Sequence, residues 1–428
     1  MTGSKKRLNL LVAFLLFASV ALFAKSTGGA EPIPLWEKEL SRESIRIVVI
    51  SDLHLGVDDS FSETVKNKEP MAEFLERLVV SDIDELVIAG DMLDEWFVPI
   101  TYPPHNDLGI FFRQVADNNS AIIAAFGKLI QSGVKVVYVP GNHDLLLDEE
   151  TLTGLIPGIS QARDGDGLGV YRAGMRSEIV IEHGHRYDTF CAPDPLSNKE
   201  ITGDYPSFLP PGYFFTRMAA TYVAEGRTAP VKKLPQIEEP SKENGDQQDA
   251  YVYYRLWSWA MNSFPIKAGF DEKVFYCGVN GYDDSFSLSD LLPVVQEDGS
   301  ISAVLYANVQ RRWDEVQEIC GIPVKNSYAL ATAGAIDHNF LDSQAVTQYF
   351  NLDPTVDVVV FGHSHIPVVN RFQKGYDKEK VYVNSGTWID ENPDHPAAST
   401  FVVVKSREDT DIVELYEYYR DGTILKLD

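Results

Sequence analysis

Five short clusters of Asp, His and Asn residues are the part of this sequence best suited to chemistry. Carboxylate, imidazole and amide groups bind divalent metals such as Mn, Fe or Zn, and no cysteine thiolate occurs in the clusters. Two such ions about 3.5–4 Å apart can bind both the attacking and the leaving oxygen of a phosphoryl group. The clusters hold six of the nine histidines in the chain. They are Asp52-Leu53-His54, Gly90-Asp91-Met92-Leu93-Asp94, Gly141-Asn142-His143-Asp144, His183-Gly184-His185 and Gly362-His363-Ser364-His365.

Each cluster follows a short run of apolar, mostly β-branched residues, which predicts a buried strand. The runs cover residues 45–50, 86–89, 134–139, 178–181 and 356–361. Each polar cluster therefore begins where a predicted strand ends. Ligands of open α/β sheets bind at the carboxyl ends of the strands, so we expect the clusters to meet there.

In this order, the five clusters resemble the calcineurin-like metallophosphoesterase superfamily. The family pattern is D-x-H, G-D-x-x-D, G-N-H followed by D or E, a His before Gly, and G-H-x-H. The resemblance covers residues 45–193 and about 355–428, and it is loosely nearest the branch of UDP-2,3-diacylglucosamine pyrophosphatases. It implies an α/β fold in which two mixed β-sheets form a sandwich flanked by helices.

The resemblance also implies a set of ligands for two divalent ions. Asp91 would bridge the ions, because a carboxylate can offer an oxygen lone pair to each. The expected ligands of the first ion are Asp52, His54, Asp91 and His365. Those of the second are Asp91, Asn142, His183 and His363.

Residues beside these ligands have expected roles of their own. His143 would face the substrate, stabilise the transferring phosphoryl charge and protonate the leaving oxygen. Asp144 would orient that imidazole or, alternatively, cap a helix. We expect Asp94 to cap a helix or hold a ligand in place, and His185 to support a ligand or touch the substrate. Arg186 would contact phosphate or form a surface ion pair.

The composition favours a large globular protein and disfavours a nucleic-acid duplex as partner. The chain has 428 residues and a formal net charge of −26. A duplex-binding protein needs a basic face, which this balance does not supply. A small phosphorylated molecule, amphipathic ones included, suits the metals better, because the ions supply positive charge locally. The three cysteines, Cys191, Cys277 and Cys320, allow one disulfide at most.

The first 30 residues read as a signal peptide. Lys5, Lys6 and Arg7 precede an apolar stretch over residues 8–24, and small residues suited to cleavage follow. We therefore expect an exported protein, periplasmic or secreted, with no stable membrane span after cleavage. The alternative is an uncleaved N-terminal anchor, although the apolar stretch is short for a span.

The sequence between His183 and His363 is long for a compact member of the family, which predicts an inserted, mainly helical cap. Helices are expected at residues 213–225, 248–264 and 302–319. The cap contains an aromatic cluster, for which core packing is the default interpretation and an apolar wall for a substrate the alternative. These aromatics are Tyr251, Tyr253, Tyr254, Trp257 and Trp259. The predicted segments are a signal peptide (1–30), a first core segment (43–193), the cap (194–340) and a second core segment (341–428).

Together these features predict a binuclear metallophosphoesterase. It would hydrolyse a phosphate monoester or diester, or a pyrophosphate, through a metal-bridging hydroxide. The alternative from a different class is a scaffold of the same fold that binds without turnover.

Overall fold

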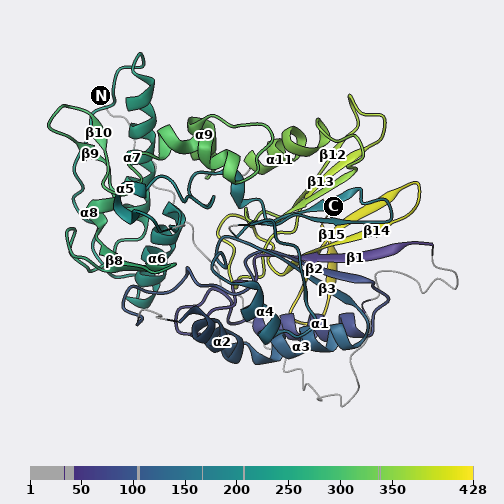
Figure 1. The fold of residues 1–428 in the computed structure, drawn as a ribbon. Coiled ribbons are helices and arrows are strands. Elements are labelled where there is room, and N and C mark those ends of the chain that lie inside the picture. Colours follow the sequence, from purple (N-terminus) through teal and green to yellow (C-terminus); the bar gives the residue numbers. More distant parts are fainter. Residues whose placement is uncertain are drawn as a thin grey trace, which may run out of the picture.

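Two β-sheets packed face to face form the body of the molecule in the computed structural model (Figure 1). The structure describes residue 33, residues 43–103, 107–165, 167–205, 208–335, residue 337 and residues 339–427. The predicted signal peptide lies outside these residues.

The larger sheet has seven strands in the order β16-β15-β14-β1-β2-β3-β4. Strands β1 to β4 run parallel, and β14 joins the other side of β1 in an antiparallel ladder that continues to β15 and β16. The strands are β1 Ile45–Ile50, β2 Glu85–Ala89, β3 Lys135–Val139, β4 Ser160–Gln161, β14 Thr400–Ser406, β15 Asp411–Tyr418 and β16 Ile424–Lys426.

The smaller sheet has five strands in the order β12-β13-β11-β6-β5. Its three central strands are parallel, and both edge strands are antiparallel to their neighbours. The strands are β5 Tyr171–Ala173, β6 Ile179–Ile181, β11 Val358–Phe361, β12 Val368–Phe372 and β13 Lys380–Asn384. Both sheets are mixed, as the family resemblance implied.

Alternation along the strands builds a core on each face of the larger sheet. In β1, Ile47 and Val49 point into the layer between the sheets, whereas Val48 and Ile50 point outward. Successive strand residues face opposite sides, so a continuous apolar run requires cover on both faces. Four helices cover the outer face: α1 Lys68–Val79, α2 Leu108–Asn118, α3 Ser120–Gln131 and α4 Glu149–Leu155.

Between β6 and β11 the chain forms a large helical segment with two small antiparallel sheets, which we call the insert. In Figure 1 most of it stands beside the sandwich, and α9 and α11 lead back to it. Its helices are η1 His185–Tyr187, α5 Lys199–Thr202, α6 Pro211–Ala224, α7 Gly245–Ser263, α8 Leu288–Leu291, α9 Val309–Ile319, α10 Tyr328–Gly334, α11 Phe340–Ala345 and η2 Val346–Phe350. Its strands are β7 Phe275–Val279, β8 Tyr282–Phe286, β9 Val294–Val295 and β10 Ile301–Ser302.

One helix predicted in the insert needs correction, and core packing is confirmed for three of the five clustered aromatics. The helix expected from residue 302 begins only at Val309, because Ile301–Ser302 pairs with Val294–Val295 as a strand. The aromatic cluster divides: Tyr253, Tyr254 and Trp257 are buried in the core of the insert, whereas Trp259 is 53% exposed. The predicted segment boundaries, and a capping role for the insert, stay predictions.

The cysteines and the helices add two further findings. Within the part of the chain that the structure describes, no disulfide joins any two of Cys191, Cys277 and Cys320. Over the described residues, no helix is both long and apolar enough to cross a membrane.

Candidate active site

The five predicted clusters meet at one end of the sandwich, in the loops that follow β1, β2, β3, β6 and β11. Backbone hydrogen bonds join these loops directly: the N–H of Asp52 donates to Gly90 O (3.1 Å) and that of Gly362 to His183 O (3.1 Å). The loop after β13 adds support, since Thr387 Oγ1 donates to Asp52 O (2.9 Å).

Close approach of these loops depends on glycine. A Cβ on Gly141 would lie 2.1 Å from Asp91 Oδ1, and one on Gly90 would lie 2.3 Å from His183 Nδ1. Several non-glycine residues here also have positive φ angles, in the left-handed region of backbone conformation. They are Asp52 (51°), His54 (43°), Asp91 (51°), His363 (69°) and His365 (59°).

A first group of donor atoms matches the ligand set expected for one ion. The two Nε2 atoms of His54 and His365 are 3.1 Å apart, and His365 Nε2 is 3.2 Å from Asp52 Oδ1. His54 Nε2 also lies 3.7 Å from Asp91 Oδ2 and 3.9 Å from Asp52 Oδ1. All four side chains that the sequence predicted for this ion therefore point to one place.

A second group surrounds the other side of Asp91. His183 Nε2 is 3.3 Å from Asp91 Oδ2, the oxygen that also faces His54, and 3.0 Å from Asn142 Oδ1. His183 Nδ1 bonds to Ala89 O (2.8 Å), which leaves Nε2 to face Asp91. One oxygen of Asp91 thus lies between the two groups, where a bridging ligand is expected.

These separations fit divalent metals. Bonds of about 2.0–2.1 Å put neighbouring ligands about 3.0–3.5 Å apart around one ion. His/Asp groups able to hold an ion include Asp52, His54 and His365, and also Asp52, Asp91 and His183. All five side chains except that of His365 are buried, and among the described residues no lysine or arginine contact balances Asp52 and Asp91.

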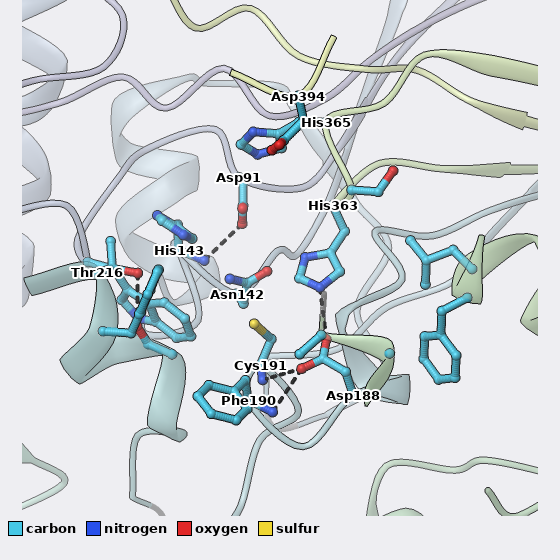
Figure 2. A pocket seen from close by; sticks show the side chains of 18 of the residues that line it. Asp91, Asn142, His143, Asp188, Phe190, Cys191, Thr216, His363, His365 and Asp394 are labelled. Carbon is cyan, nitrogen blue, oxygen red and sulfur yellow. Dashed lines mark hydrogen bonds and ion pairs between the residues drawn. The ribbon is translucent and has the colours of Figure 1, made fainter. Parts of the chain in front are cut away.

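His363 lies at the edge of the second group. Its ring centroid is 5.1 Å from that of His183, and its Nε2 bonds to Asp188 Oδ2 (2.9 Å). Nδ1 is therefore the nitrogen left for an ion. Asp188 also accepts from the N–H groups of Phe190 (2.8 Å) and Cys191 (2.9 Å), as Figure 2 shows. Sequence reasoning missed both Asp188 and Cys191, although Asp188 stands five residues after His183.

His143 faces the cavity and is held by Asp94. Its Nδ1 is 3.0 Å from Asp94 Oδ2, the oxygen that also bonds His54 Nδ1 (2.8 Å). The other oxygen of Asp94 accepts from the N–H groups of Trp96 and Phe97. The indole of Trp96 lies 5.0 Å from the His143 ring. Asp94 thus holds a predicted ligand in place, as expected, and also orients the imidazole assigned to catalysis.

The expected contact between Asp144 and His143 is absent from the described residues, and this expectation is corrected. The Asp144 carboxylate instead accepts from the N–H groups of Gly141 (2.8 Å) and Met92 (2.8 Å). It therefore ties together the loops after β2 and β3. The reason is direction: Asp144 follows His143 in a tight turn and points back into the protein, whereas Asp94 reaches the imidazole from the neighbouring loop.

His185 and Arg186 are both buried. His185 has no hydrogen-bond partner on either ring nitrogen among the described residues, and its ring lies 5.3 Å from that of His183. Arg186 binds Glu182 (2.9 Å), Asp164 (3.1 Å) and the carbonyl of Cys320 (2.9 Å). The ion pair expected for Arg186 exists but is largely buried, and the guanidinium is not available for phosphate.

The pKa values reflect the opposed charges in the site. Burial alone would lower the pKa of His54, but the hydrogen bond and charge of Asp94 outweigh it and raise the pKa to about 10. Burial likewise opposes charge on His183, yet Asp91 and Asp52 raise its pKa to about 9. Burial, then the charge of Asp91, raises the pKa of Asp144 to about 6. Cations at this position are therefore stabilised by the surrounding carboxylates.

A cavity of about 330 Å³ opens over these groups. Asp91, Asn142, His143, His363 and His365 line one end, and Figure 2 shows the three imidazoles around Asp91 and Asn142. The other end is lined by the insert, with residues from α6, α7 and α11.

Comparison with known proteins agrees with this site. Residues 45–209 match the family described as calcineurin-like phosphoesterase. The DNA polymerase II small subunit of Methanothermobacter thermautotrophicus is 32% identical over 114 residues, which are 25% of this chain and 22% of that protein. The chain therefore spans less than a quarter of that relative's length.

Solved structures that match at low similarity include Vps29 from two organisms. A single mutant of Vps29 from Entamoeba histolytica is 11% identical, with 90% of this chain and 100% of that chain covered and a TM-score of 0.27. Vacuolar protein sorting 29 from Cryptosporidium parvum is 12% identical, with 90% and 97% covered and a TM-score of 0.27. Over residues 45–209, which hold four of the five predicted metal-binding clusters, this chain matches the calcineurin-like phosphoesterase family.

Proposed function

We propose that this protein hydrolyses a phosphate monoester or diester, or a pyrophosphate, at a site for two divalent ions (Mn, Fe or Zn). The observation that supports the proposal most strongly is the position of Asp91 Oδ2. It lies 3.7 Å from His54 Nε2 and 3.3 Å from His183 Nε2, between two groups of metal-ligating atoms. A carboxylate shared in this way suits a pair of ions.

The chain's own residues supply positioning and a proton. Bound divalent ions would lower the pKa of water and offset the charge of the phosphoryl group. A water oxygen bonds to phosphorus, the bond from phosphorus to the ester oxygen breaks, and the alcohol leaves after taking a proton. We assign that proton to His143. Asp94 holds Nδ1, and His143 lines the cavity, which supports Nε2 as the nitrogen that donates.

Metal removal and one substitution test the proposal. Chelation should abolish hydrolysis of p-nitrophenyl phosphate, and Mn²⁺ should restore it. Asp91→Ala should lower activity more than removal of any other single ligand, because it takes a donor from both groups. Metal content of the purified variants, measured by mass spectrometry, separates loss of an ion from loss of chemistry.

The scaffold alternative makes the opposite prediction. Metal-loaded protein would then bind the same number of ions per chain but hydrolyse no monoester, diester or pyrophosphate. Near-normal activity of Asp91→Ala would contradict the bridging role while leaving hydrolysis itself in place.

Export is part of the same proposal. The basic residues and apolar stretch before residue 25 support it. N-terminal sequencing of native protein should find a start near Leu22 or Glu31. An intact N-terminus in a membrane fraction would favour the anchor instead.

A further inference from the structure

The cavity over the candidate site has an unusual distribution of charge. Its described lining contains five carboxylates and three histidines but no lysine or arginine. The acidic residues are Glu63, Asp91, Asp188, Asp337 and Asp394. Asp91 and Asp188 are engaged with histidines of the site, whereas Asp337 and Asp394 are exposed at its rim.

Arg186, two residues before Asp188, cannot correct this balance. Arg186 is bound on three sides by Glu182, Asp164 and the carbonyl of Cys320. A neighbouring hollow that shares Glu63 with the cavity does hold Lys66 and Arg227, but Lys66 pairs with Glu391 (3.0 Å). Sites for several phosphates normally supply arginine or lysine for each of them. In the described lining of the cavity, positive charge would therefore come from the ions and from a protonated His143, with no lysine or arginine to bind a second phosphate.

The insert end of the cavity is apolar and aromatic. Phe215 of α6 and Trp259 of α7 lie nearly parallel, with ring centroids 6.0 Å apart and an angle of 12° between planes. Leu256 and Phe340 line the same cavity. Trp259 is exposed on a helix that buries Tyr253, Tyr254 and Trp257, and its ring offers a flat apolar surface for a ligand.

We propose that the substrate carries a single phosphate on an apolar alcohol, and that the cavity discriminates against a second phosphate. The phosphate would lie at the Asp91 end and the alcohol portion against Trp259 and Phe215. Carboxylates at the rim would repel any further anionic group. This inference rests on the proposed hydrolytic function and narrows its substrate class, because it disfavours the pyrophosphates that the function alone allows.

Two matched pairs of substrates test the inference on metal-loaded wild-type protein. The first is 2-phenylethyl phosphate against glycerol 3-phosphate, which have similar alkyl leaving groups but differ in apolar surface. The second is fructose 6-phosphate against fructose 1,6-bisphosphate, which differ by one remote phosphate. In each pair we expect kcat/KM to favour the first member by at least about tenfold.

Substitutions locate the two effects. Trp259→Ala should reduce the phenylethyl preference, whereas Tyr205→Ala, an insert aromatic that is 41% exposed and lies outside the cavity lining, should leave it intact. The double variant Asp337→Asn, Asp394→Asn should lower the ratio of kcat/KM for fructose 6-phosphate to kcat/KM for fructose 1,6-bisphosphate. Glu408→Gln is the matched control, since Glu408 follows the end of β14 that pairs with the start of β1, away from the site.

The outcomes separate the inference from the function on which it rests. Hydrolysis of none of the four esters by protein that does hydrolyse bis(p-nitrophenyl) phosphate or pyrophosphate would overturn the substrate class, and hydrolysis of no phosphate compound at all, with ions bound, would contradict the proposed function. Hydrolysis in which the bisphosphate and glycerol 3-phosphate are favoured or equal would overturn the substrate class alone. Unchanged ratios in the Trp259 and double-Asp variants would also overturn it.

Discussion

Both ends of the β-sandwich bury carboxylates, but they balance them differently. At the carboxyl end of β1, Asp52 and Asp91 face imidazoles and no lysine or arginine contact is found for them among the described residues. At the opposite end, where β6, β11 and β13 begin, Asp357 binds both Lys380 (2.9 Å) and Arg176 (3.1 Å).

The opposite end supplies its own cations and donors. Arg176 also binds Asp411 (3.1 Å), and Ser406 donates to Glu178 (2.6 Å). Lys380 further donates to the carbonyls of Pro354 and Val356. A carboxylate paired with a fixed guanidinium or ammonium has no need of another cation, whereas one that faces only imidazoles can exchange their protons for a metal. The comparison thus separates carboxylates with a structural cation from carboxylates that could hold a metal.

Of the substitutions that compare the two ends, His143→Ala at the candidate site should have the largest effect on turnover. The variant should keep both ions but slow turnover by about 10²–10⁴-fold, because it lacks the proton donor. The loss should shrink for esters with good leaving groups, which need no proton. Equal losses across leaving groups would restrict His143 to a charge effect, and loss of metal would make it a ligand.

Lys380→Met tests the other end. Removing the ammonium leaves Asp357 buried without one of its partners, which should cost about 3–5 kcal/mol of unfolding free energy. Activity per folded molecule should stay normal, because Lys380 lies at the amino end of β13. Urea denaturation and specific activity measured on the same sample decide the case. Loss of activity in fully folded protein would contradict a purely structural role for the charges at this end of the sandwich.

Asp94 and Asp144 provide a finer test within the site. Asp94→Asn should lower activity about 10–100-fold, because Asp94 holds both His54 and His143. The two carboxylate oxygens of Asp144 each accept a hydrogen bond from one backbone N–H. Asp144→Asn replaces one of these oxygens and should lower stability more than activity. Steady-state kinetics beside thermal unfolding compares them. The reverse order would restore the role that the sequence suggested for Asp144.

The smallest effect is expected from Asp411→Asn. Burial, and then Glu178, raise the pKa of Asp411 to about 7, above its ordinary value of 3.8. The folded state therefore holds a proton that the unfolded state releases, so this group lowers stability as pH rises from about 4 to 7. Asparagine removes that cost and should stabilise the protein by about 1 kcal/mol at pH 8, because loss of the ion pair with Arg176 offsets part of the gain. At pH 4 the two proteins should unfold alike.

Patterns within single segments of the sequence located the residues of the site. They did not predict which loops contact each other. Each metal-ligating cluster follows a strand that the apolar runs located to within two residues, because a buried parallel strand must be apolar on both faces. Which aspartate orients His143 depends on how the loops after β2 and β3 cross. No spacing within either loop encodes that crossing, so Asp94 was assigned only a supporting role.

Some misses had signals that were present. Asn280-Gly281 separates β7 from β8, and both residues have positive φ, which is the usual two-residue hairpin turn. In α7, Trp257 and Trp259 are two residues apart, so they lie about 200° apart around the helix. They could not both face the core, and Trp259 is the exposed one.

The left-handed backbone at the site has a consequence for how this chain can change. Asp52, His54, Asp91, His363 and His365 each hold a conformation that costs an ordinary residue about 1–2 kcal/mol and glycine very little. Mutation to glycine at these positions would relieve that strain while removing a predicted metal ligand. Selection for stability alone would therefore erode the ligands first, and a chain that keeps all five side chains gives up stability that only their use can justify.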